Sequence, residues 1–243
     1  MNVLRKNEQR SEVTKQSSQG LDKSSTPATL PELAYAQLEE WICTVQLEPG
    51  EVLSEIDIAN RLNIGRTPVR EALQKLASEG LVVILPRRGV LVSEINVGRQ
   101  LELIEVRRVL EKFMVESAAS RAGQAERDQL FALADDIEKA EQGNNAEQFL
   151  DLEQQFNRVL TEACRNRFAS KTMTLLNGQS RQFWNYYYKD VLDLKKCAAI
   201  YAELARFIAK GNTQEASRMC DALIDYIDEF THATLKQRGP GSY

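Results

Sequence analysis

Two arginines and a threonine lie at the start of a segment whose spacing indicates a short helix. Arg66 and Arg70 are four residues apart, so they share one helical face. Pro68 places the start of the helix within a residue or two, because proline is tolerated only in a first turn. An arginine there can bind a guanine edge through two hydrogen bonds, and Thr67 can hold a phosphate or contact a thymine methyl group. A solvated helix face bearing two arginines would have the same local pattern.

A second basic group follows at the tip of a predicted hairpin. Two β-branched runs, residues 81–85 and 90–92, are joined by a turn that ends at Gly89. Arg87 and Arg88 lie in this turn, where they could contact the DNA backbone or an adjacent minor groove. The alternative is a charged turn that protects a sheet edge. With the helix before it, the hairpin predicts that double-stranded DNA is contacted by Arg66, Thr67, Arg70, Arg87, Arg88 and Gly89.

The net charge of the chain, −4 from 31 basic and 35 acidic residues, at first argues against nucleic acid. The charges are unevenly distributed, however. Residues 61–88 carry six basic and two acidic groups, whereas residues 30–60 carry seven acidic groups and no basic one. The acidic total therefore does not exclude DNA binding; it indicates weak non-specific binding.

Hydrophobic periodicity predicts the elements that position these residues. Apolar residues at helical spacing over 30–45 predict a first helix, stopped by the Pro-Gly pair at 49–50. Ser54 begins a second helix of about two turns, and the helix that carries the arginines ends at Gly80. Helix, helix, turn, helix and hairpin is the order of a winged helix-turn-helix.

The remainder of the chain shows helical patterns only. Six helices are predicted, at residues 99–122, 124–142, 146–165, 169–188, 190–210 and 213–236. Helices of this length form a bundle large enough to enclose a pocket. The predicted fold class is therefore mainly α: an N-terminal winged helix-turn-helix, α with a small β-hairpin, followed by an all-α six-helix bundle.

Composition divides the chain into four segments. Residues 1–29 are rich in Ser, Thr, Gln and Lys and show no helical stripe, so we expect a disordered tail. We expect the winged domain at residues 30–96, the ligand-binding and dimerisation domain at 97–236, and a short tail at 237–243.

Few residues suit enzymatic or metal chemistry. His232 is the single histidine, and the four cysteines are too widely spaced for a zinc site, so we expect buried free thiols in a reducing compartment. A Gly-rich phosphate loop and a nucleophile motif are both missing, so the sequence predicts neither an enzyme nor a cofactor. Without a signal peptide or a long apolar run, we expect a cytoplasmic protein with no membrane partner.

Four motifs together resemble the N-terminal domain of the GntR family of bacterial transcription regulators. They are LEPGEVLSE at 47–55, RTPVREAL at 66–73, EGL at 79–81 and RGV at 88–90. Gly65 stands where the family often has serine, which removes a side-chain cap but leaves a tolerated N-cap residue. The resemblance implies a dimeric DNA reader.

The helical remainder, from about residue 99 to 236, resembles the FCD effector domain of the FadR branch of that family. The resemblance lies in LIEVRRVLE at residues 103–111. It implies a ligand-sensing bundle in which Arg107 holds an acidic effector. The alternative for Arg107 is a surface ion pair with a neighbouring glutamate.

Many members of that branch bind a divalent metal through one carboxylate and three histidines. Carried over onto this chain, the carboxylate is Glu153, but the histidine positions hold Asn157, Tyr201 and either Ala222 or Leu223. An amide and a phenol are poor ligands for zinc-like ions, and no imidazole remains. We therefore predict a pocket without metal.

The aromatic run FWNYYY at residues 183–188 points in every direction around a helix, so some of its rings line a cavity, a dimer interface or solvent. Ordinary packing is one explanation; the other is a pocket wall whose phenols bind a polar or aromatic effector. Tyr201 could point into the same region. The expected effector contacts are Arg107, Glu153, Asn157, Tyr201 and Tyr186.

Taken together, these features predict a homodimeric transcription regulator, a repressor, that binds a palindromic operator. A small-molecule effector in the bundle would control it: an organic acid, an aromatic compound or an acyl-CoA. The alternative is a protein-interaction or ligand-sensing module that does not read DNA.

Overall fold

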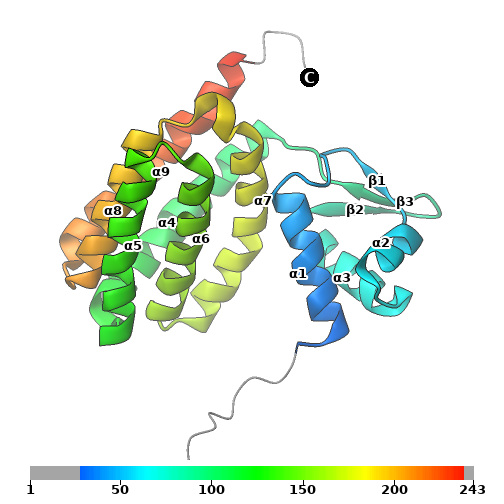
Figure 1. Cartoon of the computed structure of the whole chain (residues 1–243), viewed down its shortest axis with the longest axis horizontal. Coiled ribbons are helices and arrows are strands. Elements are labelled where there is room, and N and C mark those ends of the chain that lie inside the picture. The colour runs from blue at the N-terminus through cyan, green and yellow to red at the C-terminus, as the bar shows by residue number, and fades with distance from the viewer. Residues whose placement is uncertain (1–27, 238–243) are drawn as a thin grey trace, which may run out of the picture.

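The computed structural model describes residues 28–237, which form an N-terminal group of elements followed by a helical bundle (Figure 1). The first group contains α1 (Leu30–Cys43), β1 (Val52–Leu53), α2 (Glu55–Leu62), α3 (Arg66–Ser78), β2 (Val82–Leu85) and β3 (Gly89–Val92). The bundle contains α4 (Val97–Arg121), α5 (Gln124–Gln142), α6 (Ala146–Ala163), α7 (Arg167–Val191), α8 (Leu194–Ala209) and α9 (Thr213–Gln237). The predicted fold class, a winged helix-turn-helix before an all-α bundle, is confirmed.

Helix α1 is closed at both ends by local chemistry. Thr29 and Glu32 form a capping box, in which the Glu32 backbone N–H donates to Thr29 Oγ1 at 3.4 Å and the Thr29 N–H donates to Glu32 Oε2 at 2.8 Å. The helix ends at Cys43, two residues before the predicted end, because Val45 has a left-handed φ of 60°. Ala34, Leu38 and Ile42 are buried in the core shared with α3.

The short helices α2 and α3 follow the predicted signals. Ser54 Oγ accepts a hydrogen bond from the Asp57 backbone N–H at 3.4 Å and caps α2. Asn63 adopts a left-handed φ of 52°, which reverses the chain between the helices. Gly65 is the N-cap of α3 without a side-chain hydrogen bond, and Pro68 lies in the first turn. The predicted start of this helix is confirmed.

The hairpin belongs to a three-stranded antiparallel sheet of order β1-β3-β2. Strands β2 and β3 pair from Leu85 opposite Gly89 to Val82 opposite Val92, as the two β-branched runs predicted. Strand β1 was not predicted, because two residues are too few to show alternation. It pairs with β3, so β3 is the central strand of the sheet and β1 forms one of its two edges.

The bundle helices lie close to their predicted positions, and the main difference is the boundary between α7 and α8. Helix α7 continues to Val191 and α8 begins at Leu194, whereas the prediction placed the break at 188–190. Asp193 sets the boundary, since its carboxylate accepts a hydrogen bond from the Lys196 backbone N–H at 3.0 Å. Neither glycine nor proline marks this break in the sequence.

Helix α4 buries a different stripe from the one that predicted it. Its inward face carries Ile104 and Met114, whereas Val106, Val109 and Phe113 are 52%, 74% and 42% exposed. These three residues form a row at helical spacing, which we call the α4 row. The helix therefore presents an apolar face away from its own core.

Other expectations concern burial and the ends of the chain. The cysteines Cys43, Cys164, Cys197 and Cys220 are buried free thiols, as predicted. The predicted tails at 1–29 and 237–243 lie outside the described residues, apart from residues 28, 29 and 237. Within residues 28–237, no helix combines the length and apolar character needed to cross a membrane.

Candidate functional site

The exposed face of α3 carries the basic residues that the sequence singled out. Val69 and Leu73 anchor the helix in the core of the N-terminal domain. This orientation leaves Arg66, Thr67 and Arg70 exposed on the first turns. The structure thus brings these three side chains together at the start of one helix.

Arg70 and Arg66 differ in their surroundings. Arg70 Nη2 lies 2.8 Å from Glu55 Oε2 on α2, and Arg70 Nε also donates to the same carboxylate, although the arginine side chain is 58% exposed. The hydrogen bond from Arg70 lowers the pKa of Glu55. Arg66 makes no side-chain hydrogen bond or ion pair with any residue in 28–237. Arg70 is therefore held in place before any ligand arrives, and Arg66 is not.

The hairpin tip projects from the side of the domain opposite the bundle (Figure 1). Arg87 and Arg88 are exposed there, and Arg87 adopts a left-handed φ of 63°. Gly89 has a φ of 104°, and a Cβ at this position would lie 2.5 Å from the Leu53 carbonyl oxygen of β1. The glycine therefore permits the close approach of β1 and sets the shape of the turn that presents both arginines.

Two further basic residues in the segment 61–88 pack against aromatic rings of α1. The Arg61 guanidinium lies 3.8 Å from the centre of the Trp41 ring, and Lys75 Nζ lies 3.4 Å from the centre of the Tyr35 ring. The basic residues of segment 61–88 thus form two groups: arginines that face solvent on α3 and the hairpin, and two cations that pack against α1. Sequence reasoning counted these cations but did not predict their aromatic partners.

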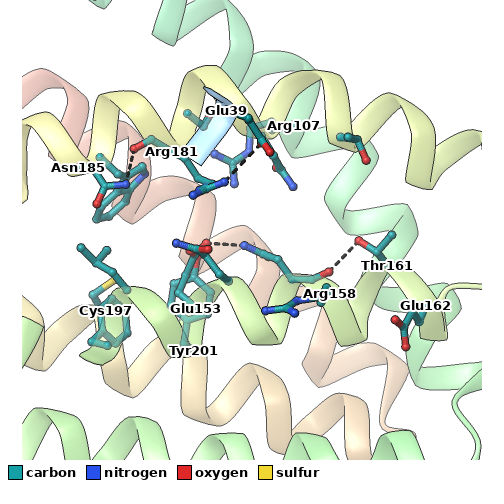
Figure 2. A pocket seen from close by; sticks show the side chains of 18 residues that line it. Glu39, Arg107, Glu153, Arg158, Thr161, Glu162, Arg181, Asn185, Cys197 and Tyr201 are labelled. Carbon is teal, nitrogen blue, oxygen red and sulfur yellow. Dashed lines mark hydrogen bonds and ion pairs between the residues drawn. The ribbon is translucent and has the colours of Figure 1, made fainter. Parts of the chain in front are cut away.

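A cavity of about 340 Å³ opens between α6 and α7, with α8 at its floor (Figure 2). Its wall combines aromatic rings with charged and amide side chains, and it includes one residue of α1, Glu39. Of the expected effector contacts, the structure brings four to this cavity: Arg107, Glu153, Asn157 and Tyr201.

Glu153 is the centre of a hydrogen-bonded group in this wall. Asn157 Nδ2 donates to Glu153 Oε1, and the Tyr201 hydroxyl donates to the same oxygen at 3.1 Å. Burial raises the pKa of Glu153, and Arg107 opposes the rise. The carboxylate is therefore held by donors of the protein itself.

Arg107 is buried rather than at the surface. It is 5% exposed, lies on the cavity wall and pairs with Glu111 one turn further along α4. Burial acts to lower the pKa of Arg107, but Glu111 raises it, and the net direction is upward. The ion pair with a neighbouring glutamate, expected as the alternative, is thus present. It is buried rather than at the surface, and Arg107 lines the cavity as well.

The donor set around Glu153 does not fit a divalent metal. Glu153 Oε1 already accepts hydrogen bonds from the Asn157 amide and the Tyr201 hydroxyl. Both groups therefore direct a hydrogen, and not a lone pair, toward the place where a metal ion would bind the carboxylate. Leu223, at one position carried over from the family pattern, is an apolar core residue. Among the described residues, no group of three or more His, Cys, Asp or Glu side chains is arranged to hold a metal ion.

The aromatic run divides between core, cavity and solvent. Phe183 and Tyr187 are buried with Phe230. Trp184 lines the cavity and stacks on Phe230, with 4.1 Å between ring centres. Tyr186 is 42% exposed and does not belong to the cavity wall. The structure therefore brings Trp184, and not Tyr186, to the expected effector site.

Sequence reasoning missed the residues that link the cavity to the N-terminal domain. Arg181 of α7 lines the cavity and forms ion pairs with Glu39 and Glu40 of α1. Arg181 and Glu39 are 142 positions apart. No local spacing signal connects residues at such a separation.

Comparison with known proteins gives matches to two family models. Residues 30–92 match the model described as bacterial regulatory proteins, gntR family, and residues 102–226 match the FCD domain. The solved structure of E. coli McbR/YncC superimposes with a TM-score of 0.77 over 86% of this chain and 100% of that one. At 18% identity, this likeness concerns the fold alone.

Two curated relatives are named as transcriptional regulators. The Nta operon transcriptional regulator of Aminobacter aminovorans is 31% identical over 136 residues, 55% of this chain and 63% of that protein. The HTH-type transcriptional repressor RspR of Escherichia coli (strain K12) is 30% identical over 144 residues, 59% of this chain and 63% of that protein. The matched region thus spans less than two thirds of each relative.

Proposed function

The chain belongs to the GntR family of bacterial regulatory proteins and carries an FCD domain, and on this basis we propose that it is a ligand-controlled repressor that binds a palindromic operator as a homodimer. The family is one of regulators rather than enzymes. In this proposal residues 30–96 bind double-stranded DNA, and residues 97–236 bind the effector and form the dimer. Repression is supported by the relative RspR, which is named as a repressor.

The observation that carries the proposal is that α3 and the hairpin both expose basic side chains. Helix α3 exposes Arg66, Thr67 and Arg70 on its first turns, and the turn before Gly89 exposes two more arginines. In a winged helix-turn-helix the first turns of this helix enter the major groove, while the wing meets the backbone or an adjacent minor groove. The N-terminus of α3 adds a positive dipole for phosphate.

The cavity supports a small organic acid as the effector. Three arginines, Arg107, Arg158 and Arg181, line it beside three glutamates, and the arginines are its groups that can bind an anion. Its volume of about 340 Å³ lies near the lower end of the range for ligand pockets, about 300–1,000 Å³. This size favours a small acid over an acyl-CoA. The proposed contacts are Arg107, Glu153, Asn157 and Tyr201, with Trp184 in place of Tyr186.

We propose that the effector binds without a metal ion, because the Glu153 carboxylate is already engaged by Asn157 and Tyr201. Metal analysis of protein purified without chelator tests this point. We expect less than stoichiometric metal, and one tightly bound equivalent would overturn the proposal.

The dimer is proposed to form through the α4 row, Val106, Val109 and Phe113, against the same row of a second copy. Two ion pairs flank the row, so both charge signs lie beside it: Lys112 pairs with Asp221 at 2.6 Å, and Arg108 pairs with Asp225 at 2.8 Å. A two-fold axis through such a face brings cations of one copy near anions of the other. The face is therefore self-complementary in apolar character and in charge.

Operator binding by alanine variants tests the proposal. Fluorescence anisotropy with the intergenic DNA next to the gene, compared with a scrambled duplex, gives the discrimination between the two. We expect Arg66→Ala and Arg70→Ala each to lose about 1–3 kcal/mol of discrimination. We expect Arg88→Ala to weaken binding to both duplexes and to lower the salt dependence by about one phosphate contact.

Lys139→Ala is the matched control, because Lys139 is 70% exposed on α5 and its loss removes one charge far from α3. It should bind both duplexes like the unaltered protein. If neither arginine of α3 affects operator binding, the chain is instead a protein-interaction or ligand-sensing module that does not read DNA.

A further inference from the structure

Residues 178–181 of α7, which we call the α7 junction, contact the N-terminal domain directly. The Cys43 thiol of α1 donates to the Gly178 carbonyl oxygen at 3.4 Å, and Gln179 Nε2 donates to the Glu79 carbonyl oxygen at 2.7 Å. A Cβ at Gly178 would lie 2.9 Å from Leu81 Cδ1. The helix and the domain are therefore packed without spare room at this point.

Arg181, the last residue of the α7 junction, faces both α1 and the cavity. Its Nη2 lies 2.7 Å from Glu40 Oε2, and its Nη1 lies 3.4 Å from Glu39 Oε1. The side chain is only 19% exposed. Figure 2 shows Arg181 and Glu39 on the wall opposite Glu153 and Tyr201. One guanidinium thus holds the N-terminal domain and forms part of the cavity.

Two neighbouring polar groups of the α7 junction lack a hydrogen-bond partner among residues 28–237. They are Ser180 Oγ and Arg181 Nε, which belong to consecutive residues that both line the cavity, and both atoms are themselves buried. Ser180 is 3% exposed, so its hydroxyl is deeply buried. Buried polar groups are nearly always paired, and an arginine Nε can only donate. The missing partner is therefore an acceptor, and a carboxylate offers two acceptor oxygens with a charge that suits the guanidinium.

We propose, resting on the function proposed above, that a ligand carboxylate binds Ser180 Oγ and Arg181 Nε and competes with Glu39 and Glu40 for Arg181. Ligand binding then loosens the ion pairs that hold α1 against α7 and frees the N-terminal domain to change its orientation. The α7 junction is the place where occupancy of the cavity is passed to the DNA-binding domain.

Electrostatic repulsion explains why a bound carboxylate would weaken the ion pairs of Arg181 with Glu39 and Glu40. The ligand would place a third carboxylate around a single guanidinium, next to Glu39, which itself lines the cavity. Burial raises the pKa of Glu39, so the charged form of this side chain is already disfavoured where the ligand would sit. The Glu39 contact is also the longer of the two, at 3.4 Å against 2.7 Å. It is therefore the first contact to give way.

The coupling has a reciprocal consequence. If the ligand weakens the contact between α1 and α7, then weakening that contact by mutation must strengthen ligand binding by the same free energy. Replacing Glu40 and replacing Arg181 should therefore have opposite effects on ligand affinity, although both replacements break the same ion pair. A purely structural role for the pair would make the two variants behave alike.

The experiment titrates the full-length protein with acetate, succinate, citrate and benzoate, and with acetamide, succinamide and benzamide as uncharged controls. Intrinsic tryptophan fluorescence reports binding, because Trp184 lines the cavity and Trp41, the other tryptophan, lies on α1. We expect at least one carboxylate to bind and its amide not to bind. We expect Arg181→Gln and Ser180→Ala to weaken that binding about 10-fold or more, and Glu40→Gln to strengthen it severalfold.

Arg206→Gln is the matched control, because Arg206 also bridges two helices through two carboxylates, Asp135 and Glu138, but lies outside the cavity wall. It should leave the titration unchanged. Circular dichroism of each variant verifies that it is folded. Equal carboxylate binding by the unaltered protein, Arg181→Gln and Ser180→Ala would overturn the assigned site, and binding of no carboxylate in the panel would overturn the ligand class.

Operator binding separates this inference from the function on which it rests. The bound carboxylate should weaken operator affinity of the unaltered protein and have a smaller effect on Glu40→Gln. If the carboxylate binds through Ser180 and Arg181 but leaves operator affinity unchanged, the coupling is wrong and the DNA-binding function stands. If the ligand-free protein does not bind the operator, the proposed function fails, while the fluorescence titration still decides whether the carboxylate site exists.

Discussion

The ion pair between Glu55 and Arg70 places a negative charge beside an arginine proposed to read DNA. The two side chains are 2.8 Å apart, and both lie at the surface of the N-terminal domain. The carboxylate orients the guanidinium but also repels phosphates. We expect Glu55→Gln to raise affinity for non-specific duplex DNA by roughly 3- to 10-fold at low salt, and to reduce the ratio of operator to non-specific affinity.

Anisotropy titrations with both duplexes check this expectation, and Asp57→Asn is the control. Asp57 lies on the same helix, and its loss removes the same charge without touching Arg70. It should raise affinity for both duplexes and leave their ratio unchanged. An unchanged ratio in Glu55→Gln as well would mean that the carboxylate does not position Arg70.

The pKa of Glu153 gives a prediction about stability and pH. Because burial raises this pKa above its ordinary value of 4.5, the native state binds the proton more tightly than the unfolded state. The contribution of Glu153 to the free energy of unfolding is therefore full below pH 4.5 and is lost as pH rises through the raised pKa. Glu153→Gln does not titrate, so its stability relative to the unaltered protein should increase between pH 4.5 and pH 7.5.

Urea unfolding across this pH range measures the difference, which amounts to about 1.4 kcal/mol when the native and unfolded pKa values of this carboxyl differ by one. Glu147→Gln, an exposed change on the same helix, serves as the control for loss of one carboxylate. A difference for Glu153→Gln that falls with pH would mean that the native state holds this carboxylate in its charged form more tightly than water does.

At the residue level, the parts of the site that follow from local order could be predicted. Arg66 and Arg70 share a face because helical periodicity places them there, and Pro68 marks the helix start. Arg181 could not be predicted, because its importance depends on Glu39 of a helix 142 residues away and on a cavity that exists only after the bundle packs.

Among the elements, the hairpin depends on one backbone position. Gly89 has a φ of 104°, and any Cβ there would lie 2.5 Å from the Leu53 carbonyl oxygen. We expect Gly89→Ala to destabilise the N-terminal domain by about 2 kcal/mol and to weaken operator binding, because β1 must move and the turn that presents Arg88 changes shape. Thermal unfolding and anisotropy measure the two effects.

Gly143→Ala is the control, since Gly143 closes α5 with an ordinary φ of −76°. It should be close to neutral in both measurements. If Gly89→Ala binds the operator normally while the domain is destabilised, the hairpin supports the fold of the domain but its tip does not contact DNA.

Physical reasons also explain which helices and strands could be predicted from the sequence and which could not. The helices were predictable from apolar spacing, which within the bundle is clearest in α4 and α9, and from the Gly- and Asn-containing breaks between most of the bundle helices. Strand β1 was not, because it has two residues and its partner β3 lies about forty positions away. The apolar residues of α4 predicted the helix correctly but did not reveal which of its faces is buried, since Arg107 and Glu111 occupy part of the inward face.

At the scale of the whole molecule, α1 stands between the two functions. Its apolar side packs on α3, its aromatic rings hold Arg61 and Lys75, and its carboxylates reach Arg181 at the cavity. A rotation of α1 would therefore move the proposed DNA-contacting helix together with it. The hydrogen bond from Cys43 to the Gly178 carbonyl oxygen is a further contact that such a rotation would change.

The α4 row gives the prediction that concerns the assembled protein. Val109 is 74% exposed, so Val109→Glu should not disturb the fold of a single chain. In the proposed dimer, however, it would bury two like charges near the two-fold axis. We expect the variant to be monomeric in light scattering at concentrations where the unaltered protein is dimeric.

Operator affinity should fall with the loss of the dimer, because each domain would then bind its half-site without the effective concentration that a partner supplies. Phe168→Glu is the control: Phe168 is 71% exposed on α7, and its replacement adds the same charge away from the α4 row. If Phe168→Glu gives monomers and Val109→Glu remains dimeric, the interface lies on α7. In that case the exposed apolar face of α4 must serve another contact.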